Sequence, residues 1–144
     1  MDVTKKIIYK VGEIPHIDSI VDLYVSVNWG HKNYIEMLER AYNNSEYVVS
    51  AWLESGELIG LGRAISDMAF TVYFPDLLVK PDWQNKGIGA MLMNMMIEKF
   101  GQYHNMVLIA EDNRAREFYQ CSGFQTEQNA LSIINPFVEI GSDQ

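Results

Sequence analysis

The chain has 144 residues, the length of one ordinary domain, and its 48% hydrophobic content excludes global disorder. Nineteen acidic against eleven basic side chains give a formal net charge of −8, which opposes binding to nucleic acid or to an anionic membrane surface. The single cysteine, Cys121, excludes an intramolecular disulfide and a cysteine-based zinc site. We therefore expect one domain over residues 1–144 that binds neither nucleic acid nor membrane.

The first half of the chain is typical of a strand, two helices and a hairpin. Residues 7–10 are a short strand candidate. Apolar residues recur at i, i+3, i+4 and i+7 over residues 17–24 and again over 34–42, which predicts two amphipathic helices. Residues 47–53 and 58–65 are β-rich and are joined by a short turn that contains a glycine, which predicts a hairpin.

A third β-rich run covers residues 69–79 and contains a proline, Pro75. Proline has no N–H group to donate to a neighbouring strand, so it is found at edges and bulges rather than inside regular ladders. We therefore expect a bulged or splayed strand that opens near Pro75.

The second half of the chain alternates helices and strands. Residues 87–100 carry apolar side chains at helical spacing, and residues 106–110 are continuously apolar, as in a buried strand. A short helix is predicted over residues 115–122, and a last strand over residues 131–134. The resulting order, β-α-α-β-β-β-α-β-α-β, predicts an α/β domain with a mixed sheet.

A polar turn with two glycines joins the third β-rich run to the helix at residues 87–100. Gly87 and Gly89 have no Cβ atoms, and the first N–H groups of a helix point outward at the positive end of its dipole. This arrangement favours an anion such as a pyrophosphate. The alternative is that the glycines only shape a turn before an ordinary helix.

Three motifs follow one another in this region: Val79-x-Pro81, Gln84-x-x-Gly87-x-Gly89, and, after a further strand, Asn113 with Phe118-Tyr119-x-x-x-Gly123-Phe124. In order and spacing they resemble the GNAT superfamily of acyl-CoA-dependent N-acetyltransferases. Further segments are similar to its bacterial and chloroplast branch, which includes plant serotonin N-acetyltransferase-like enzymes: Gly62-Arg63-Ala64-x-Ser66-Asp67, Asp76-Leu77-x-Val79 and Asp112-Asn113. The resemblance implies a GNAT-like domain whose mixed sheet has a central splayed strand pair flanked by helices.

The resemblance also implies that the chain binds acetyl-CoA as a cosubstrate. The implied contacts are Leu77, Leu78 and Val79 along the pantetheine arm, Gln84, Asn85, Lys86, Gly87, Ile88 and Gly89 around the pyrophosphate, and Asn113 and Phe118 beside the pantetheine. Lys86 stands where the family often has arginine, and it still supplies a cation.

The implied activity is transfer of an acetyl group to a primary amine of a small molecule, by direct attack in a ternary complex. Tyr119 would protonate the departing thiolate; without the motif it would be read as a core tyrosine. The general base is open, because the strand before the glycine turn has no glutamate. Asp76, the nearest carboxylate, is the candidate base, although it equally suits a structural hydrogen-bonding role. Asp67, Asp112 or water are rival bases.

Two other functions fit the same motifs. A catalytically degenerate acyl-CoA-binding module is favoured by the missing glutamate and opposed by Tyr119. Transfer of a longer acyl group would use the same residues with a larger acyl pocket. The excess of acidic over basic side chains favours cationic acceptors. The resemblance to the family also implies a homodimer.

The remaining reactive side chains indicate no metal site. His16, His31 and His104 are far apart in the sequence and are expected at the surface, and Cys121 is expected to be an inert packed thiol. Trp29 is a candidate wall of an acceptor pocket. The N-terminal apolar stretch is too short for a secretion signal, and no apolar run approaches the ~20 residues of a spanning helix, so a cytoplasmic protein is expected.

Within the helix at residues 87–100, the methionines divide between core and surface. The helical spacing places Met91 in the core stripe and leaves Met93 outside it. Methionine fills irregular core space readily, so a stripe of this kind is more typical of packing than of a binding site.

Overall fold

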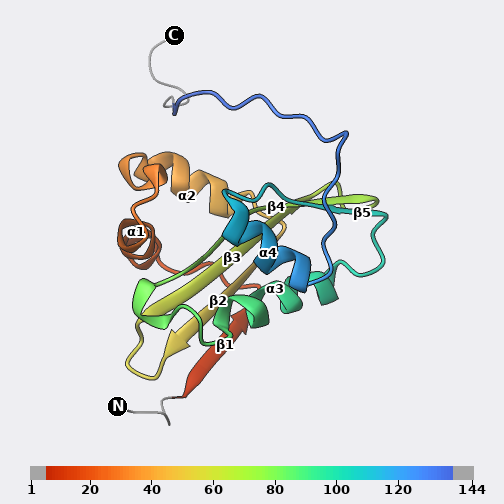
Figure 1. Ribbon diagram of the computed structural model, residues 1–144. Coiled ribbons are helices and arrows are strands. Elements are labelled where there is room, and N and C mark those ends of the chain that lie inside the picture. The colour runs from red at the N-terminus through yellow and green to blue at the C-terminus, as the bar shows by residue number, and fades with distance from the viewer. Residues whose placement is uncertain (1–5, 138–144) are drawn as a thin grey trace.

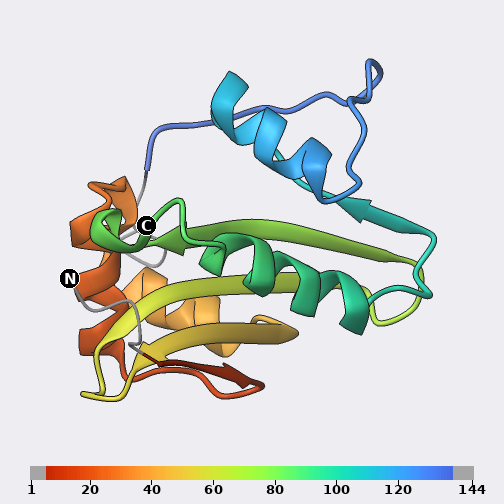
Figure 2. The ribbon, with the colours of Figure 1, turned by 60° about the horizontal axis from the view of Figure 1, so that its bottom comes forward.

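The computed structural model describes residues 6–137, which form a five-stranded sheet with helices on both faces (Figure 1; Figure 2). In chain order the elements are β1 (Ile7–Val11), α1 (Ile17–Ser26), η1 (Gly30–Asn33), α2 (Ile35–Asn43), β2 (Tyr47–Leu53), β3 (Leu58–Ser66), β4 (Thr71–Val79), η2 (Pro81–Trp83), α3 (Ile88–Lys99), β5 (Asn105–Val107) and α4 (Asn113–Cys121). Strands β1 to β4 form an antiparallel meander, and β5 lies parallel to β4 after the crossover through α3. The predicted α/β fold with a mixed sheet is confirmed. Among the described residues, no helix is both long and apolar enough to cross a membrane.

Helix α3 packs on one face of the sheet, above two glycines of β3. A Cβ atom added to Gly60 would lie 3.0 Å from the side chain of Leu92, and one added to Gly62 would lie 2.8 Å from that of Met96. The glycines therefore leave the space in which Leu92 and Met96 are fully buried. This close approach determines how the helix is rotated about its own axis.

The core face of α3 therefore differs from the face predicted from the sequence. Met91 is 46% exposed, whereas Met93 is fully buried. The helical period in the sequence shows which residues share a face, but the space on the opposing sheet decides where that face is centred. Here the space lies over the glycines of β3.

Helices α1 and α2 cover the other face of the sheet. Tyr24 of α1 and Tyr42 of α2 are fully buried there, packed with Leu61 of β3 and Leu78 of β4. Both helices occupy the segments in which the apolar spacing predicts them. The sheet thus has an apolar core on each face.

Strand β4 contains a bulge at Phe74-Pro75. Arg63 of β3 is opposite Asp76, but Ile65 is opposite Tyr73, so two steps along β3 correspond to three along β4. Because of the extra residue, side chains beyond the bulge point to the face of the sheet opposite to the one that simple alternation would give them. Phe74 packs in the core beneath α3, while Asp76, two residues later, contacts Tyr24 on the opposite face.

The bulge also marks the point at which β4 and β5 separate. Their parallel pairing covers three residue pairs and ends with Tyr73 opposite Val107. Beyond these residues the two strands diverge. Strand β4 continues to Val79, whereas the segment after β5 leads into α4. The prediction that the strand opens near Pro75 is confirmed.

Strand β5 is shorter and less buried than predicted. It covers Asn105–Val107 rather than residues 106–110, and Val107 and Ile109 are 45% and 55% exposed. A continuous apolar run is buried on both faces only where strands or helices cover both faces. Since β5 is the edge strand of the described sheet, its apolar side chains stay partly exposed.

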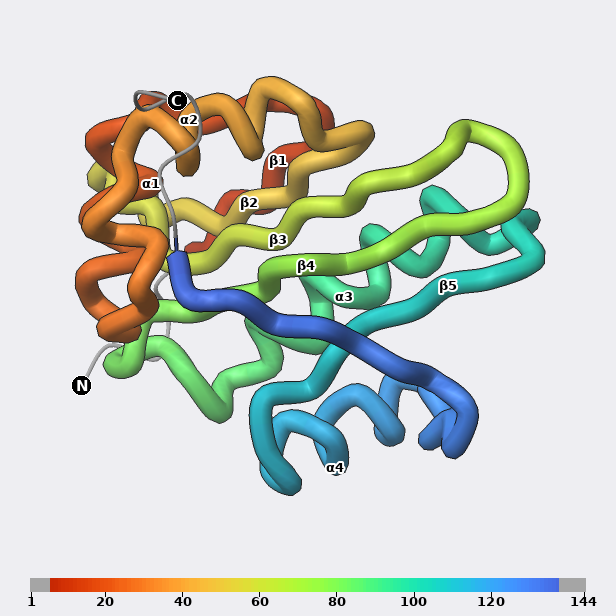
Figure 3. The backbone as a smooth tube through the Cα atoms, turned by 90° about the horizontal axis from the view of Figure 1, so that it is seen from above, coloured from red at the N-terminus to blue at the C-terminus, as the bar shows by residue number. Residues whose placement is uncertain are grey.

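The strand predicted over residues 131–134 is wrong. These residues are extended but lie outside the sheet, with Leu131 and Ile133 at 95% and 90% exposure. The segment after α4 instead runs back toward α1 and η1 (Figure 3), where Phe137 stacks on Tyr34 at a ring-centroid distance of 5.4 Å. A β-rich run becomes a strand only where a sheet edge meets it, and this path leads away from the edge at β5.

Candidate active site

A cavity of about 720 Å³ lies between the end of β4 and the segment that leads from β5 into α4. Four parts of the chain form its walls: the turn after α1, the end of β4, the loop into α3, and the start of α4 with the residues before it. The lining residues are Ser26, Val27, Asn28, Trp29, Leu77, Leu78, Val79, Pro81, Gln84, Asn85, Gly87, Gly89, Ala90, Glu111, Asp112, Arg114, Ala115, Phe118 and Tyr119. The bulge in β4 therefore positions this cavity, because it ends the strand pairing that would otherwise close the space.

Most of the predicted site residues lie in these walls. They are Leu77, Leu78, Val79, Gln84, Asn85, Gly87, Gly89, Phe118 and Tyr119. Lys86, Ile88, Asn113 and Asp76 lie outside the lining. Ile88 is buried in the core, and Asp112 lines the cavity beside Asn113. The binding roles of these residues stay predictions.

Gly87 leaves open space at the N-terminus of α3, where an anion could approach the helix. It is the N-cap of α3 with φ of 86°, a left-handed conformation that glycine adopts without strain, and it supplies no side-chain cap. A Cβ atom added to it would meet nothing within 4 Å, so the space in front of it is open. The N–H groups of the first helical turn have no partner within the helix and are available to a phosphate. The loop therefore fits the pyrophosphate of acetyl-CoA.

Two polar side chains organise the loop before Gly87. Gln84 donates from Nε2 to the carbonyl oxygen of Val79 at 2.9 Å, which ties the loop to the end of β4. Arg114 of α4 donates from Nη2 to Oδ1 of Asn85 at 3.2 Å. Arg114 thus brings a cation to the anion site from a distant part of the chain. Arg114 is not among the site residues predicted from the sequence, although it directly follows the Asp112-Asn113 motif.

Tyr119 lies in the cavity wall on α4. Burial, followed by the charges of Glu111 and Asp76, raises the pKa of Tyr119 to about 12. The phenol therefore keeps its proton at neutral pH and can donate it to a group that develops negative charge. Its ring packs at 5.1 Å from Phe118 and 6.0 Å from Phe124, between ring centroids, which holds the hydroxyl group in place.

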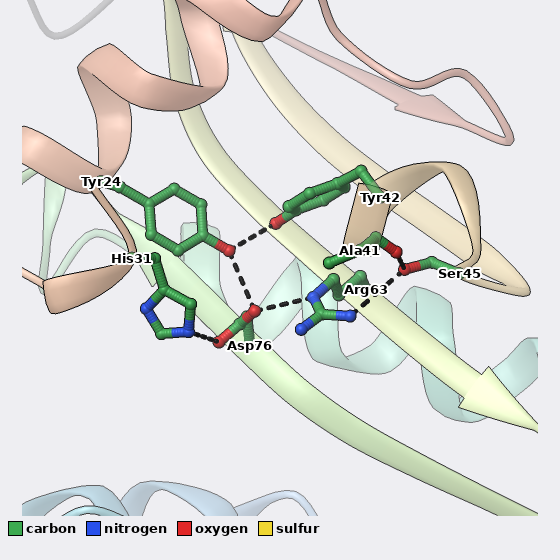
Figure 4. Close-up of polar contacts among 7 residues, drawn as sticks. All are labelled: Tyr24, His31, Ala41, Tyr42, Ser45, Arg63 and Asp76. Atoms are coloured by element: carbon green, nitrogen blue, oxygen red, sulfur yellow. Dashed lines mark hydrogen bonds and ion pairs between the residues drawn. The ribbon is translucent and has the colours of Figure 1, made fainter. Parts of the chain in front are cut away.

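Asp76 is buried in a polar network on the other side of β4 (Figure 4). Its Oδ2 accepts a hydrogen bond from Nε of Arg63 at 2.7 Å and another from the hydroxyl of Tyr24 at 3.0 Å. The hydroxyls of Tyr24 and Tyr42 are 2.8 Å apart. Arg63 also donates to Oγ of Ser45 at 3.4 Å. The network thus joins α1, β3, β4 and the end of α2.

The protonation states in this network agree with its hydrogen bonds. Burial raises the pKa of Tyr24 and of Tyr42, so both phenols remain protonated and neutral. Burial lowers the pKa of Arg63, but the charge of Asp76 and its hydrogen bond outweigh this, and the pKa is raised. Arg63 and Asp76, with side chains 10% and 4% exposed, form a buried ion pair. This geometry matches the structural role considered for Asp76, and as a base it would act only through an intervening group.

His31 is not the surface residue that the sequence predicts. Its side chain is 30% exposed, and its Nε2 is 3.8 Å from Oδ1 of Asp76. The rings of Tyr24 and Phe137 lie 5.2 Å and 5.0 Å from it, between centroids, and Nδ1 is buried with no hydrogen-bond partner among residues 6–137. The turn after α1 carries both His31 and the Trp29 that lines the cavity, so the polar network supports the cavity wall from behind.

The sequence analysis also missed Glu111, which lines the cavity between β5 and α4. Burial, then the charges of Asp112 and Asp76, raise the pKa of Glu111, and His31 lowers it. The available signal was its place directly after a predicted strand of a β-α unit, since side chains at that end of a strand often meet a ligand.

The other candidate residues have structural positions. Asp67 accepts hydrogen bonds from the backbone N–H groups of residues 69, 70 and 71, which confirms it as a turn residue. Asp112 caps α4 by accepting from the N–H of Ala115 at 2.8 Å. Cys121 is exposed, not packed, and lies outside the cavity lining. No three His, Cys, Asp or Glu residues in the described part of the chain are grouped to hold a metal ion.

Comparison with known proteins agrees with this geometry. Residues 14–124 match the acetyltransferase (GNAT) family. The chain belongs to the GNAT family of acetyltransferases. A GNAT-family acetyltransferase from Streptococcus pneumoniae has the same fold, with a TM-score of 0.80 and 28% identity over 93% of this chain and 100% of that one. The resemblance inferred from the motifs is therefore confirmed.

Two curated relatives carry N-acetyltransferase names. The uncharacterized N-acetyltransferase ycf52 of Gracilaria tenuistipitata var. liui is 31% identical over 74% of this chain and 60% of its own length. The chloroplastic serotonin N-acetyltransferase 2 of Oryza sativa subsp. japonica is 28% identical over 67% of this chain and 50% of its own length. The chain thus spans half to three-fifths of these relatives. Since one of them is chloroplastic, the cytoplasmic location stays a prediction.

Replacing Gly87 by alanine should weaken acetyl-CoA binding by about tenfold or more, equivalent to ~1.4 kcal/mol, because the new methyl group enters the open space before α3. Gly56→Ala is the matched control. Gly56 has φ of 95°, its added Cβ also meets nothing within 4 Å, and it lies in the β2–β3 turn, outside the cavity lining. Both variants carry the same backbone strain. Calorimetric titration showing equal affinities for the two would contradict the anion site.

Replacing Asp76 by asparagine should lower the free energy of unfolding by ~3–5 kcal/mol, because Arg63 then lacks its buried counter-charge. Urea unfolding measures this loss, and Asp67→Asn, at an exposed carboxylate, should lose less. A pH–rate profile separates the catalytic alternative. If Asp76 also accepts the amine's proton, Asp76→Asn turns over slowly near neutral pH and recovers at high pH. Parallel profiles would leave Asp76 a structural role alone.

Proposed function

We propose that the protein transfers an acetyl group from acetyl-CoA to the primary amine of a small molecule, by direct attack in a ternary complex. One observation carries the proposal: a single cavity joins the glycine anion site at the start of α3 to the protonated phenol of Tyr119. These are the two ends that an acetyl-CoA-dependent transfer needs, a site for the pyrophosphate and an acid beside the thioester. Membership of the GNAT family supports it.

The cavity walls support a definite placement of acetyl-CoA. Its pyrophosphate would contact the first turn of α3 at Gly87 and Gly89, with Lys86 and Arg114 as nearby cations. The pantetheine arm would follow Leu77-Leu78-Val79, where β4 has left β5 and its backbone groups on that side are available. Phe118 would border the arm, and Asn113 would stand at the entrance to α4. The thioester then lies near Tyr119.

The reaction needs three proton transfers that side chains can provide. An alkylammonium has a pKa near ~10.4 and must first give a proton to a base. Its nitrogen then bonds to the thioester carbon while the carbonyl electron pair moves to oxygen. When that pair returns, the C–S bond breaks and the thiolate takes the proton of Tyr119. After the attack the nitrogen carries one proton more than the amide product needs. This proton passes to Tyr119 and restores its phenol. One proton is therefore released overall.

Direct transfer is favoured over a route through a cysteine. Cys121 is exposed and lies outside the cavity lining, so it is not placed to accept the acetyl group. The binding-module alternative lacks a comparable argument, because it would have no use for a phenol that is held in the cavity and kept protonated. The name of the rice relative gives serotonin as its acceptor. With Trp29 in the cavity wall, this supports an aromatic amine as the first acceptor to test.

A screen of CoA release across a panel of amines tests the proposal. We expect saturable release with at least one primary amine, and a product whose mass is that of the amine plus one acetyl group. Longer acyl-CoA donors in the same assay test the alternative acyl group. Tight acetyl-CoA binding without release for any amine would favour the binding module instead.

Replacing Tyr119 by phenylalanine keeps the ring and removes the acid. Turnover at saturating substrates should fall by about 10²-fold or more, the usual scale for a general acid, while acetyl-CoA affinity is retained. Tyr103→Phe is the matched control, because Tyr103 packs on Phe100 outside the cavity lining. Stopped-flow and steady-state rates on one amine give the comparison. Equal rates for the two variants, with chemistry limiting, would mean that another group protonates the thiolate.

A further inference from the structure

The acceptor end of the cavity has one carboxylate that no other part of the described chain uses. Glu111 lies four residues after Val107, in the segment between β5 and α4 that diverges from β4. It lines the cavity together with Trp29 and Tyr119. Among the described residues, no lysine, arginine or histidine forms an ion pair with it, and no hydrogen bond involves its side chain. It is therefore available to a ligand.

The other charged groups of the cavity are already engaged. Asp112 accepts the N–H of Ala115 as the cap of α4. Arg114, the only basic side chain in the lining, donates to Asn85 at the anion site. The cavity therefore has groups of both charges. Arg114 and the helix N–H groups at the loop before α3 suit a phosphate, whereas the carboxylate of Glu111 interacts electrostatically with Tyr119.

We propose that Glu111 binds the ammonium group of the acceptor and takes its first proton, so that the substrates are cationic primary amines. This inference rests on the proposed acetyl transfer and names the substrate class of the same site. One N–H bond of the ammonium breaks, its electron pair stays on nitrogen as the nucleophile, and the proton goes to a carboxylate oxygen of Glu111. Glu111 then returns that proton to water.

The surroundings of Glu111 suit this role. The titratable groups that interact electrostatically with it are Asp112 at the start of α4, Asp76 of β4, Tyr119 of α4 and His31 of η1. Burial and the two aspartates raise the pKa of Glu111, although His31 opposes them, and a carboxylate with a raised pKa is a better proton acceptor. An arriving ammonium supplies the positive charge that this acidic end lacks.

Binding of a charged and an uncharged probe tests the site without requiring turnover. The protein saturated with CoA is titrated with phenethylammonium and with 2-phenylethanol, its neutral isostere. We expect the wild type to bind the ammonium about tenfold more tightly or better, equivalent to ~1.4 kcal/mol. Glu111→Gln should lose this preference and keep its CoA affinity. Glu117→Gln, the same change at an exposed position of α4 outside the cavity lining, should keep both.

Each outcome decides between the alternatives. No preference for the ammonium in the wild type, or a preference that survives in Glu111→Gln, overturns the proposal. Glu111→Ala gives the same comparison if the glutamine variant does not fold. Ammonium binding through Glu111 without CoA release from acetyl-CoA would refute the acetyl transfer and leave the subsite standing. If the wild type transfers acetyl groups and Glu111→Gln binds ammonium and turns over as the wild type does, the acetyl transfer stands and the role of Glu111 is refuted.

A pH–rate profile checks the proton transfer itself. In Glu111→Gln, kcat/KM for phenethylamine should fall by about 10²-fold near pH 7, the scale expected for a lost general base. The deficit should narrow as the pH rises toward the amine's own pKa, near ~10.4, because free amine no longer needs the base. A deficit that is constant with pH would remove Glu111 as the proton acceptor.

Discussion

One extra residue in β4 determines the shape of the functional region. The bulge at Phe74-Pro75 arises where proline cannot donate to a neighbouring strand, and beyond it the pairing with β5 stops. Two consequences follow. The strands diverge and leave a cavity with free backbone groups along one wall, and the faces of β4 are exchanged, so that Asp76 points toward α1 and α2 instead of toward α3. Cavity and polar network thus have the same structural origin.

The polar network holds helices α1 and α2 against the sheet. The pair of Arg63 and Asp76 is buried, and its desolvation is offset by short hydrogen bonds, including those from Tyr24 to Asp76 and between the two tyrosine hydroxyls. Because Tyr24 belongs to α1 and His31 to η1, the same contacts orient the turn that carries Trp29 into the cavity. The buried carboxylate of Asp76 therefore supports the site, whereas Glu111, for which the described residues provide no ion pair or side-chain hydrogen bond, lines the cavity itself.

The features that were predicted correctly are those with a local cause. The helical periods of α1 and α2, the hairpin turn at Gly56, the opening at Pro75 and the glycine turn before α3 each depend on residues a few positions apart. The incorrect predictions depend on distant parts of the chain. The segment at residues 131–134 has a strand-like composition but meets no sheet edge, and the buried face of α3 was displaced by the glycines of β3.

The amino-acid sequence by itself determined the fold class, the GNAT membership and the glycine turn before α3, because a missing Cβ, a missing N–H and a helical period act within a few residues. Only the tertiary structure decided what each carboxylate does. Asp76 is 13 residues from Arg63 and 52 from Tyr24 in the sequence, and the fold brings all three into contact and removes them from water. Asp112 is held as a helix cap, while Glu111, one residue earlier, lines the cavity and has no ion pair within the part of the chain that the structure describes. The chemistry of a carboxylate depends on its burial and on its partners, and both are properties of the assembled fold.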